Sequence, residues 1–372
     1  MDQWLAGPGA ELLIELTDRA FDLARNVQKQ RESVVSSYTS SRQWHLVARP
    51  DGRPAPSDFV LREHKILPPE AGQILVRNQF LSVDPYMRRR MDDVESYVPP
   101  FQLDEPMDGG AVGVVVASEC DEIAVGTHVQ HMLGWREYAL LDATAVTVID
   151  ADAAPLSAYL GVLGTTGLTA YAGLSRIARL QPGETVFVSG AAGAVGSQVG
   201  QIARLMGASR VIGSAGSADK VRLLVEEYGF DEAFDYHDSP VVDQLRAAAP
   251  YGIDVYFDNV GGEHLEAAID VLNLRGRIVL CGMISLYNST EATAAPRNLI
   301  LAINKRLSLE GMLARDHADL RAEFVAQAVE WLATGQLRHR ETVAHGIAAT
   351  ADAFLHMLAG GNTGKMVVRL DY

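Results

Sequence analysis

The sequence predicts an α/β fold in which a doubly wound parallel sheet is joined to a second, β-rich domain. Its length of 372 residues is too great for one ordinary domain and suits two. Short apolar runs bounded by Gly, Pro and Asp fill the segment from Gln43 to Asp150, which is typical of strands. From Gly183 onward, strand-like runs alternate with helical patterns, which is typical of a parallel sheet with helices on both faces.

Residues 1–41 stand apart as an N-terminal extension. Their apolar residues recur at helical spacing, at Leu12, Leu16, Ala20, Leu23 and Val27. The Ser/Thr-rich segment Ser36–Ser41 is typical of a linker. Two interpretations stay open, namely a loosely attached helix or tail, and a helix that docks on a partner subunit. Acidic residues between the apolar ones argue against a mitochondrial transit peptide.

Residues 42–162 are expected to form a small antiparallel, barrel-like domain, with strands near Ile74–Val76, Val112–Val116 and Val146–Ile149. Residues 163–335 are expected to form the parallel sheet, whose strands should include Thr185–Ser189, Arg210–Ser214, Ile253–Asp258 and Arg277–Cys281. Helices should end near Met206 and cover Ala218–Tyr228 and Glu263–Leu272. Residues 336–372 change back to strand, helix and strand, and we expect them to return to the first domain.

The charge and the cysteine content of the chain limit its possible binding partners and its possible cellular compartment. A formal net charge of −15 argues against nucleic acid as a partner, because an acidic surface repels phosphate backbones. The chain has 2 cysteines, Cys120 and Cys281, which excludes a four-cysteine zinc site within one chain and suits a reducing cytoplasm. We see no secretory signal and no apolar run long enough to span a membrane, so we expect a cytoplasmic protein.

A glycine-rich loop stands where the first strand of the parallel sheet should become a helix. Gly190, Gly193 and Gly196 are spaced three apart in this loop. Small residues there permit a tight turn, close approach of backbone N–H groups to a pyrophosphate, and close packing of helix on strand. The end of the next strand, Gly213–Ser217, is small and neutral, where NAD sites usually carry Asp or Glu. The loop and this strand end therefore predict a site for NADPH.

Lys220 is the candidate partner of the 2′-phosphate. It falls in the first turn of the next helix, where a ligand anion would offset the unfavourable interaction between a cation and the helix dipole. The alternative is a solvated lysine balanced by Asp219.

No metal site is predicted, since His64, His128 and His131 are the likeliest histidine ligands in the first domain and only His128 and His131 are close in sequence. Without zinc, hydroxyls, backbone N–H groups or the cofactor ribose must polarise a substrate.

Several motifs occur along the chain, at Asp84–Arg88, Leu163–Tyr171, Gly193–Gly196 with Gly200–Ala203, Phe257–Gly262, Cys281–Asn288 and Gly361–Lys365. With these motifs, the chain from Arg42 to Tyr372 resembles the zinc-independent medium-chain dehydrogenase/reductases, in the group of leukotriene B4 12-hydroxydehydrogenase, prostaglandin reductase and curcumin reductase. The resemblance implies a Rossmann domain for NADPH, a GroES-like catalytic domain and a homodimer. It also implies reduction of the double bond of an α,β-unsaturated ketone or aldehyde, an enone or enal.

The resemblance also implies site residues. The pyrophosphate would lie on Gly193, Ala194, Val195 and Gly196, the 2′-phosphate at Lys220 and the adenosine near Tyr236. Further cofactor contacts would come from Asn259, Cys281, Gly282, Ile284, Tyr287, Met312, Leu313 and Asn362. Of these, the loop from Cys281 to Tyr287 would lie beside the nicotinamide. Two departures leave the substrate preference open. The family often has Met-Pro where this chain has Thr165-Thr166, and it commonly has an aromatic residue where this chain has Met312.

Tyr287 is the candidate catalytic donor, because hydride addition to the β-carbon of an enone places negative charge on the carbonyl oxygen. Tyr86 is a second hydroxyl candidate, which would mainly shape the pocket. In the alternative, Tyr287 only packs against the cofactor and water protonates the enolate. Three other functions stay open: an NADPH:quinone reductase, a secondary-alcohol dehydrogenase and a non-catalytic NADPH-binding protein.

Overall fold

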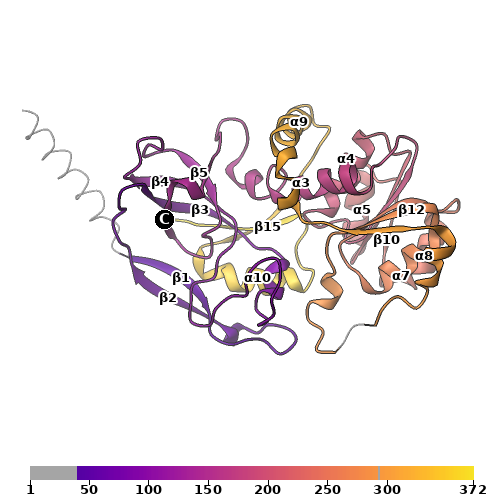
Figure 1. Cartoon of the computed structure of the whole chain (residues 1–372), viewed down its shortest axis with the longest axis horizontal. Helices are drawn as coiled ribbons and strands as arrows, with labels where there is room; N and C mark the ends of the chain where they lie inside the picture. The colour runs from indigo at the N-terminus through magenta and orange to yellow at the C-terminus, as the bar shows by residue number, and fades with distance from the viewer. Residues whose placement is uncertain (1–39, 292–293) are drawn as a thin grey trace, which may run out of the picture.

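The computed structural model describes residues 40–291 and 294–372, and the predicted N-terminal helix lies outside these residues. The described chain forms two units side by side along the long axis of the molecule (Figure 1). One unit carries a seven-stranded and a two-stranded sheet, and the other carries a six-stranded parallel sheet. The predicted α/β fold with a second, β-rich domain is therefore confirmed. No helix in the described part of the chain is both long and apolar enough to cross a bilayer.

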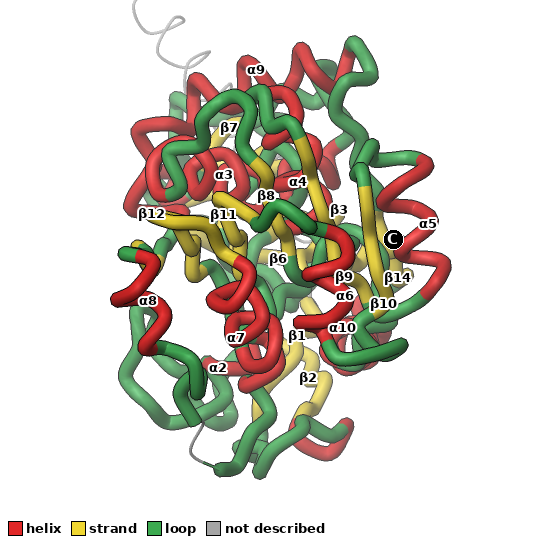
Figure 2. The backbone as a smooth tube through the Cα atoms, turned by 90° about the vertical axis from the view of Figure 1, so that its right-hand side faces the viewer, coloured by secondary structure: helices red, strands yellow, loops and turns green. Residues whose placement is uncertain are grey.

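The parallel sheet has the strand order β10-β9-β8-β11-β12-β13. Its strands are β8 (Thr185–Val188), β9 (Arg210–Ala215), β10 (Glu232–Asp235), β11 (Ile253–Asp258), β12 (Leu272–Leu280) and β13 (Ser308–Gly311). Its helices are α3 (Thr165–Ala172), α4 (Gly196–Leu205), α5 (Ala218–Glu226), α6 (Val241–Ala248), α7 (Gly262–Val271), α8 (Ile300–Lys305) and α9 (Arg321–Ala333). Helices lie on both faces of this sheet (Figure 2), which explains why its central strands are continuous apolar runs.

The β-rich unit is built around a sheet of order β14-β15-β3-β4-β5-β7, with β6 paired to β3. Its strands are β1 (Ser40–Leu46), β2 (Phe59–Lys65), β3 (Gln73–Ser82), β4 (Ala111–Ser118), β5 (His128–His131), β6 (Tyr138–Asp142), β7 (Thr147–Val148), β14 (Glu341–His345) and β15 (Lys365–Arg369). It also holds α2 (Tyr86–Arg89) and α10 (Thr350–Leu358). The C-terminal strand β15 lies antiparallel beside β3, so the chain ends in the sheet of the first unit.

Two expectations from the sequence need correction. Ser40 and Ser41 belong to β1 and not to a linker, and the Ser41 hydroxyl accepts a hydrogen bond from the Tyr138 N–H at 3.1 Å. No sequence pattern indicates β10 or β13. Both are short strands at the sheet edges, and all of β13 is exposed, so no buried apolar run marks it.

A shared hydrophobic core joins the two units. Val112 of β4 and Val367 of β15 are fully buried in the same cluster as Val188, Val199 and Phe324 of the parallel-sheet unit. Burying apolar surface stabilises by about 25 cal/mol per Å², so this core holds the units against each other.

Candidate active site

The candidate site begins at the carboxyl ends of β8 and β11, which are neighbours in the sheet. From β8 the chain continues to β9 on one side, and from β11 it continues to β12 on the other side, so the strand order reverses between them. Ligands of open α/β sheets bind at such a point. Ser189 follows β8 and Asn259 follows β11. Asn259 Nδ2 donates to the Ser189 carbonyl at 2.8 Å, and the Asn259 N–H donates to Ser189 Oγ at 3.0 Å. These bonds tie the two strand ends together.

The glycine loop after β8 has the geometry of a phosphate site. Gly190 has a φ of 57°, in the left-handed region that favours glycine. A Cβ on Gly196 would lie 2.4 Å from the Gly190 carbonyl oxygen, so only glycine lets α4 begin this close to the loop. Within the described residues, the N–H groups of Ala194, Val195 and Gly196 have no backbone acceptor. These donors and the positive end of the α4 dipole suit a pyrophosphate.

The C-terminal segment lies directly on this loop. The Gly364 N–H donates to the Ala192 carbonyl at 2.8 Å, and Gly364 pairs with Gly193 as an isolated bridge. Asn362 Nδ2 donates to the Gly364 carbonyl at 2.8 Å, which places Asn362 next to the bridge. The first unit therefore contributes Asn362 to the same place as the glycine loop.

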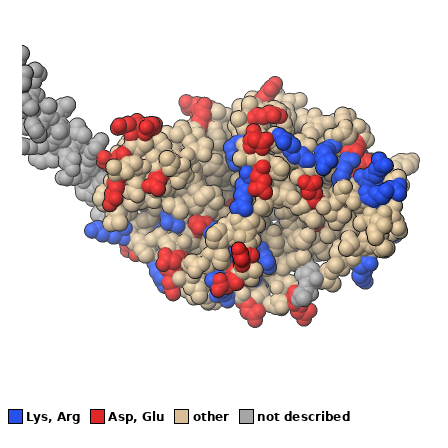
Figure 3. All heavy atoms as spheres, in the orientation of Figure 1, with Lys and Arg blue, Asp and Glu red and all other residues tan. Residues whose placement is uncertain are grey.

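The end of β9 is neutral and has a lysine beside it. Ser217 Oγ caps α5 and accepts the Lys220 N–H at 3.3 Å, while Lys220 Nζ donates to the Gly360 carbonyl at 2.7 Å. Burial lowers the pKa of Lys220. A Cβ on Gly216 would lie 2.9 Å from the Tyr236 hydroxyl, so Tyr236 stands beside this strand end. Although the whole chain is acidic, Lys and Arg side chains gather over the α4–α5 side of the face in Figure 3.

The residues predicted beside the nicotinamide come together at the ends of β11 and β12. The N–H groups of Cys281 and Gly282 both donate to the Asp258 carbonyl at 3.0 Å, and the Ile284 N–H donates to the Asn259 carbonyl at 3.3 Å. A Cβ on Gly282 would lie 3.5 Å from the Tyr287 hydroxyl. The loop after β12 therefore folds so that the Tyr287 hydroxyl lies beside Gly282, next to the end of β11.

The tyrosine hydroxyls of the site are neutral donors. Burial raises the pKa of Tyr287, and a hydrogen bond from the Met283 backbone opposes this shift. Burial, with the charge of Asp84, raises the pKa of Tyr86, whose hydroxyl is buried without a hydrogen-bond partner among the described residues. Tyr97 is near enough to add to the shift of both. Because the Tyr287 oxygen accepts a backbone hydrogen bond, its own proton is free for another acceptor.

Met312 and Leu313 directly follow β13, so they also lie at the carboxyl ends of the parallel strands. The Met312 side chain, however, is only 7% exposed and belongs to the hydrophobic core. A Cβ on Gly173 would lie 3.0 Å from the Met312 sulfur. A contact of Met312 with the cofactor would therefore come from its backbone.

Two contacts across the site involve residues that sequence reasoning missed. Arg88 is 2% exposed, and its guanidinium donates to the Gly52 carbonyl at 2.8 Å and to Asn288 Oδ1 at 3.2 Å. Arg315 donates to the Tyr97 carbonyl at 2.6 Å. Arg88 lies in the quoted motif Asp84–Arg88, but neither pairing has a local sequence signal.

The histidine candidates do not assemble. His131 is buried, with Nε2 2.9 Å from Asn78 Oδ1, and burial lowers its pKa to about 3. His64 instead stacks on His45, with ring centroids 5.0 Å apart. Between Ser40 and Tyr372, in the residues that the structure describes, no group of three or more His, Cys, Asp or Glu side chains is arranged to hold a metal ion.

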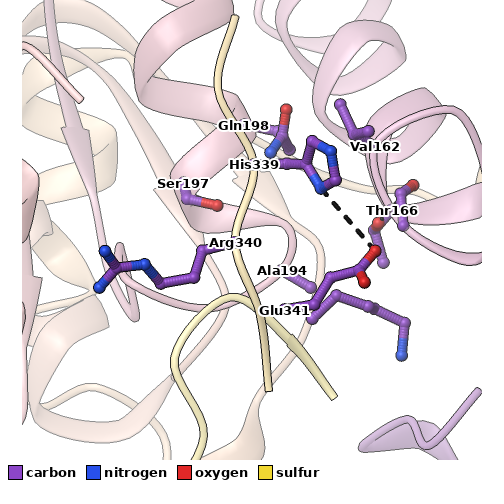
Figure 4. Close-up of a pocket in the computed structure, with 10 residues that line it drawn as sticks. Val162, Thr166, Ala194, Ser197, Gln198, His339, Arg340 and Glu341 are labelled. Atoms are coloured by element: carbon purple, nitrogen blue, oxygen red, sulfur yellow. Dashed lines mark hydrogen bonds and ion pairs between the residues drawn. The ribbon is translucent and has the colours of Figure 1, made fainter. Parts of the chain in front are cut away.

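A small cavity lies behind the glycine loop, where the two units meet (Figure 4). It is lined by Thr166, Ala194, Gln198, His339 and Glu341, among others, and its volume of about 10 Å³ suits a single water molecule. A more open cavity of about 590 Å³ is lined by segments near Pro155, Tyr228, Leu332 and Arg340. Neither cavity contains a predicted catalytic residue, so neither is assigned to the substrate.

Comparison with known proteins places the chain among oxidoreductases. Residues 42–149 match the family described as the N-terminal domain of oxidoreductase, and residues 194–334 match the zinc-binding dehydrogenase family. The 2-alkenal reductase (NADP(+)-dependent) of Nicotiana tabacum is 40% identical over 90% of this chain and 98% of its own length. The NADPH-dependent curcumin reductase of Escherichia coli is 39% identical over 89% of this chain and 97% of its own length.

A solved structure agrees with these relatives. CurA from Vibrio vulnificus in complex with NADPH is 40% identical, with a TM-score of 0.85, and the match covers 89% of this chain and 99% of CurA.

Proposed function

Because the chain belongs to the medium-chain dehydrogenase/reductase family, we propose that it reduces the carbon–carbon double bond of enones and enals with NADPH. Two observations carry the cofactor part. The glycine loop has N–H groups without a backbone acceptor among the described residues, and Lys220 lies beside a neutral strand end. The relatives named for alkenal, curcumin and prostaglandin reduction support the substrate class.

In this proposal, Tyr287 is the hydrogen-bond donor that stabilises the negative charge formed on the substrate. When bound, NADPH would supply a hydride to the β-carbon of the substrate, and the double-bond electrons would then move to the carbonyl oxygen as an enolate. The Tyr287 hydroxyl would donate a hydrogen bond to that oxygen, and a proton from water, added at the α-carbon, would complete the reduction. Tyr86, from the first unit, would mainly shape the pocket around the substrate.

A quinone reductase is the second candidate. The quinone oxidoreductase of Escherichia coli, complexed with NADPH, has a TM-score of 0.71 at 20% identity, a likeness that shows the fold alone. The two functions differ in the product, because a quinone gives a hydroquinone and an enone gives a saturated carbonyl.

A screen of NADPH oxidation tests the proposal. We expect turnover with enones and enals, products two hydrogens heavier by mass spectrometry, and the same rates after dialysis against a chelator. A chelator would remove zinc, and it should have no effect because the described residues contain no group of side chains arranged to bind zinc. Turnover with quinones alone would support the second candidate. Reduction of NADP+ by secondary alcohols, with ketones as the products and no enone reduction, would overturn both.

We also propose a homodimer formed at the free edge of the parallel sheet. β13 is the outermost strand, and its four residues are exposed. Just before it in the chain, Leu299 and α8 present apolar side chains to solvent: Leu299 is 44%, Ile300 61% and Ile303 71% exposed. An unpaired edge strand next to an apolar patch favours pairing with a second copy. The two cysteines are free, and we expect the dimer to act in a reducing cytoplasm.

The variant Ile303→Lys should convert this dimer to a monomer. Light scattering after size exclusion should give twice 40.2 kDa for the wild type and 40.2 kDa for the variant. Tyr251→Lys is the matched control, because Tyr251 is 93% exposed outside the patch and its replacement should leave the mass unchanged. A wild-type monomer, or a dimeric Ile303→Lys, would refute this interface.

A further inference from the structure

Asp258, the last residue of β11, is a buried carboxylate with an asymmetric set of partners. Its side chain is 0% exposed. One oxygen, Oδ1, accepts the N–H groups of Val260 and Gly261 at 3.0 and 2.8 Å. The same oxygen lies 2.7 Å from the Tyr256 hydroxyl and 3.2 Å from Ser189 Oγ. Hydrogen bonds to one carboxylate oxygen favour the ionised form.

The other oxygen of Asp258 is unsatisfied. Oδ2 is buried and has no hydrogen-bond partner in the part of the chain that the structure describes. No described lysine or arginine forms an ion pair with it. A buried carboxylate without a cation is costly, and such a group calls for an explanation. Burial raises the pKa of Asp258, and the hydrogen bonds to Oδ1 oppose that shift.

The Asp258 carboxylate lies next to the loop that is expected to contact the nicotinamide. The Asp258 carbonyl accepts both the Cys281 and Gly282 N–H groups, and Asn259 is the next residue in the chain. Cys281 and Gly282 belong to the loop that the family resemblance implies beside the nicotinamide. The charge also reaches Cys281, because burial together with Asp258 raises the pKa of that thiol to about 12.

We propose that Asp258 supplies a fixed negative charge that binds the oxidised nicotinamide, which is cationic, more strongly than the neutral reduced ring. This inference rests on the proposed function, since it assumes that NADP(H) occupies the site. Stabilising the oxidised ring makes NADPH a stronger hydride donor, because a buried charge that no described cation neutralises acts on the ring through a low dielectric.

A purely structural role for Asp258 predicts something different. An anchor that only holds the loops after β11 and β12 would affect the reduced and oxidised cofactors alike, because both bind through the same phosphates and ribose. The ratio of the two dissociation constants therefore separates the electrostatic role from the structural one.

The test measures the Kd of NADP+ and of NADPH for the full-length protein by calorimetry, in the wild type and in Asp258→Asn. We expect Asp258→Asn to weaken NADP+ about tenfold more than NADPH, which raises the potential of the bound cofactor by about 30 mV. Tyr256→Phe is the matched control, because it removes a hydrogen bond to the same carboxylate without changing the charge. Its effect on the two forms should be equal.

Asp258→Glu keeps the charge and should keep the wild-type ratio even if both constants rise. If Asp258→Asn does not fold, Asp258→Ala provides the same comparison. An equal loss for both cofactor forms in the neutral variants would overturn the inference and leave the proposed function intact. A wild type that binds neither form would instead remove the proposed function.

Discussion

Replacing Tyr287 with phenylalanine should lower kcat for enone reduction about 100-fold, while the KM for NADPH changes by less than about twofold. The reason is that the Tyr287 hydroxyl accepts a hydrogen bond from the Met283 backbone and keeps its own proton for the enolate oxygen. That oxygen carries full charge only after hydride transfer, so the lost hydrogen bond should affect the rate and not the binding of the cofactor. Steady-state kinetics with an enone measure both constants.

Tyr86→Phe is the control for this prediction. Its hydroxyl is also buried and lacks a described partner, but it belongs to α2 of the other unit. We expect it to lower kcat less than Tyr287→Phe does, because we assign it mainly to the shape of the pocket. A Tyr287→Phe enzyme with full kcat would show that the tyrosine only packs against the cofactor and that water serves the enolate.

Replacing Lys220 with alanine should raise the KM for NADPH about 50-fold and leave the KM for NADH nearly unchanged. Lys220 is part-buried and donates to the Gly360 carbonyl, and burial lowers its pKa. A 2′-phosphate would replace that neutral acceptor by a charged one. A hydrogen bond between charged groups contributes about 1.5–3 kcal/mol, which corresponds to the expected change.

Arg222→Ala is the matched control for Lys220, because Arg222 lies on the same helix and pairs with Asp219 on the exposed surface. Its replacement should leave both KM values as they are. If Lys220→Ala changes the KM values for NADPH and NADH equally, Lys220 does not recognise the phosphate, and the alternative of a solvated lysine would hold.

The sequence was enough to predict the parallel sheet and the cofactor loop, because both depend on local patterns. Val186, Phe187 and Val188 form a buried apolar run, and Gly190, Gly193 and Gly196 follow it directly. The edge strand β13 gave no such signal, since none of its residues is buried. Ser40 and Ser41 were misjudged because β1 is defined by its pairing with β2, which lies later in the chain.

Much of the site depends on contacts between residues that are far apart in the sequence. Arg88 meets Asn288 across 200 positions, and Arg315 meets Tyr97 across 218. Asp258 could be read as the end of a strand, but its partners Ser189 and Cys281 come from neighbouring strands of the sheet. Local pattern reasoning identifies which residue types are present, and only the strand order shows which of them meet.

The product of one labelled turnover tests the central claim most directly. Cinnamaldehyde is incubated with the enzyme and NADPH that carries deuterium at both C4 positions of the nicotinamide, and the product is identified by mass spectrometry and NMR. The proposed function predicts hydrocinnamaldehyde with deuterium on the β-carbon. Cinnamyl alcohol labelled on the former carbonyl carbon, or hydrocinnamaldehyde without deuterium on the β-carbon, would contradict it.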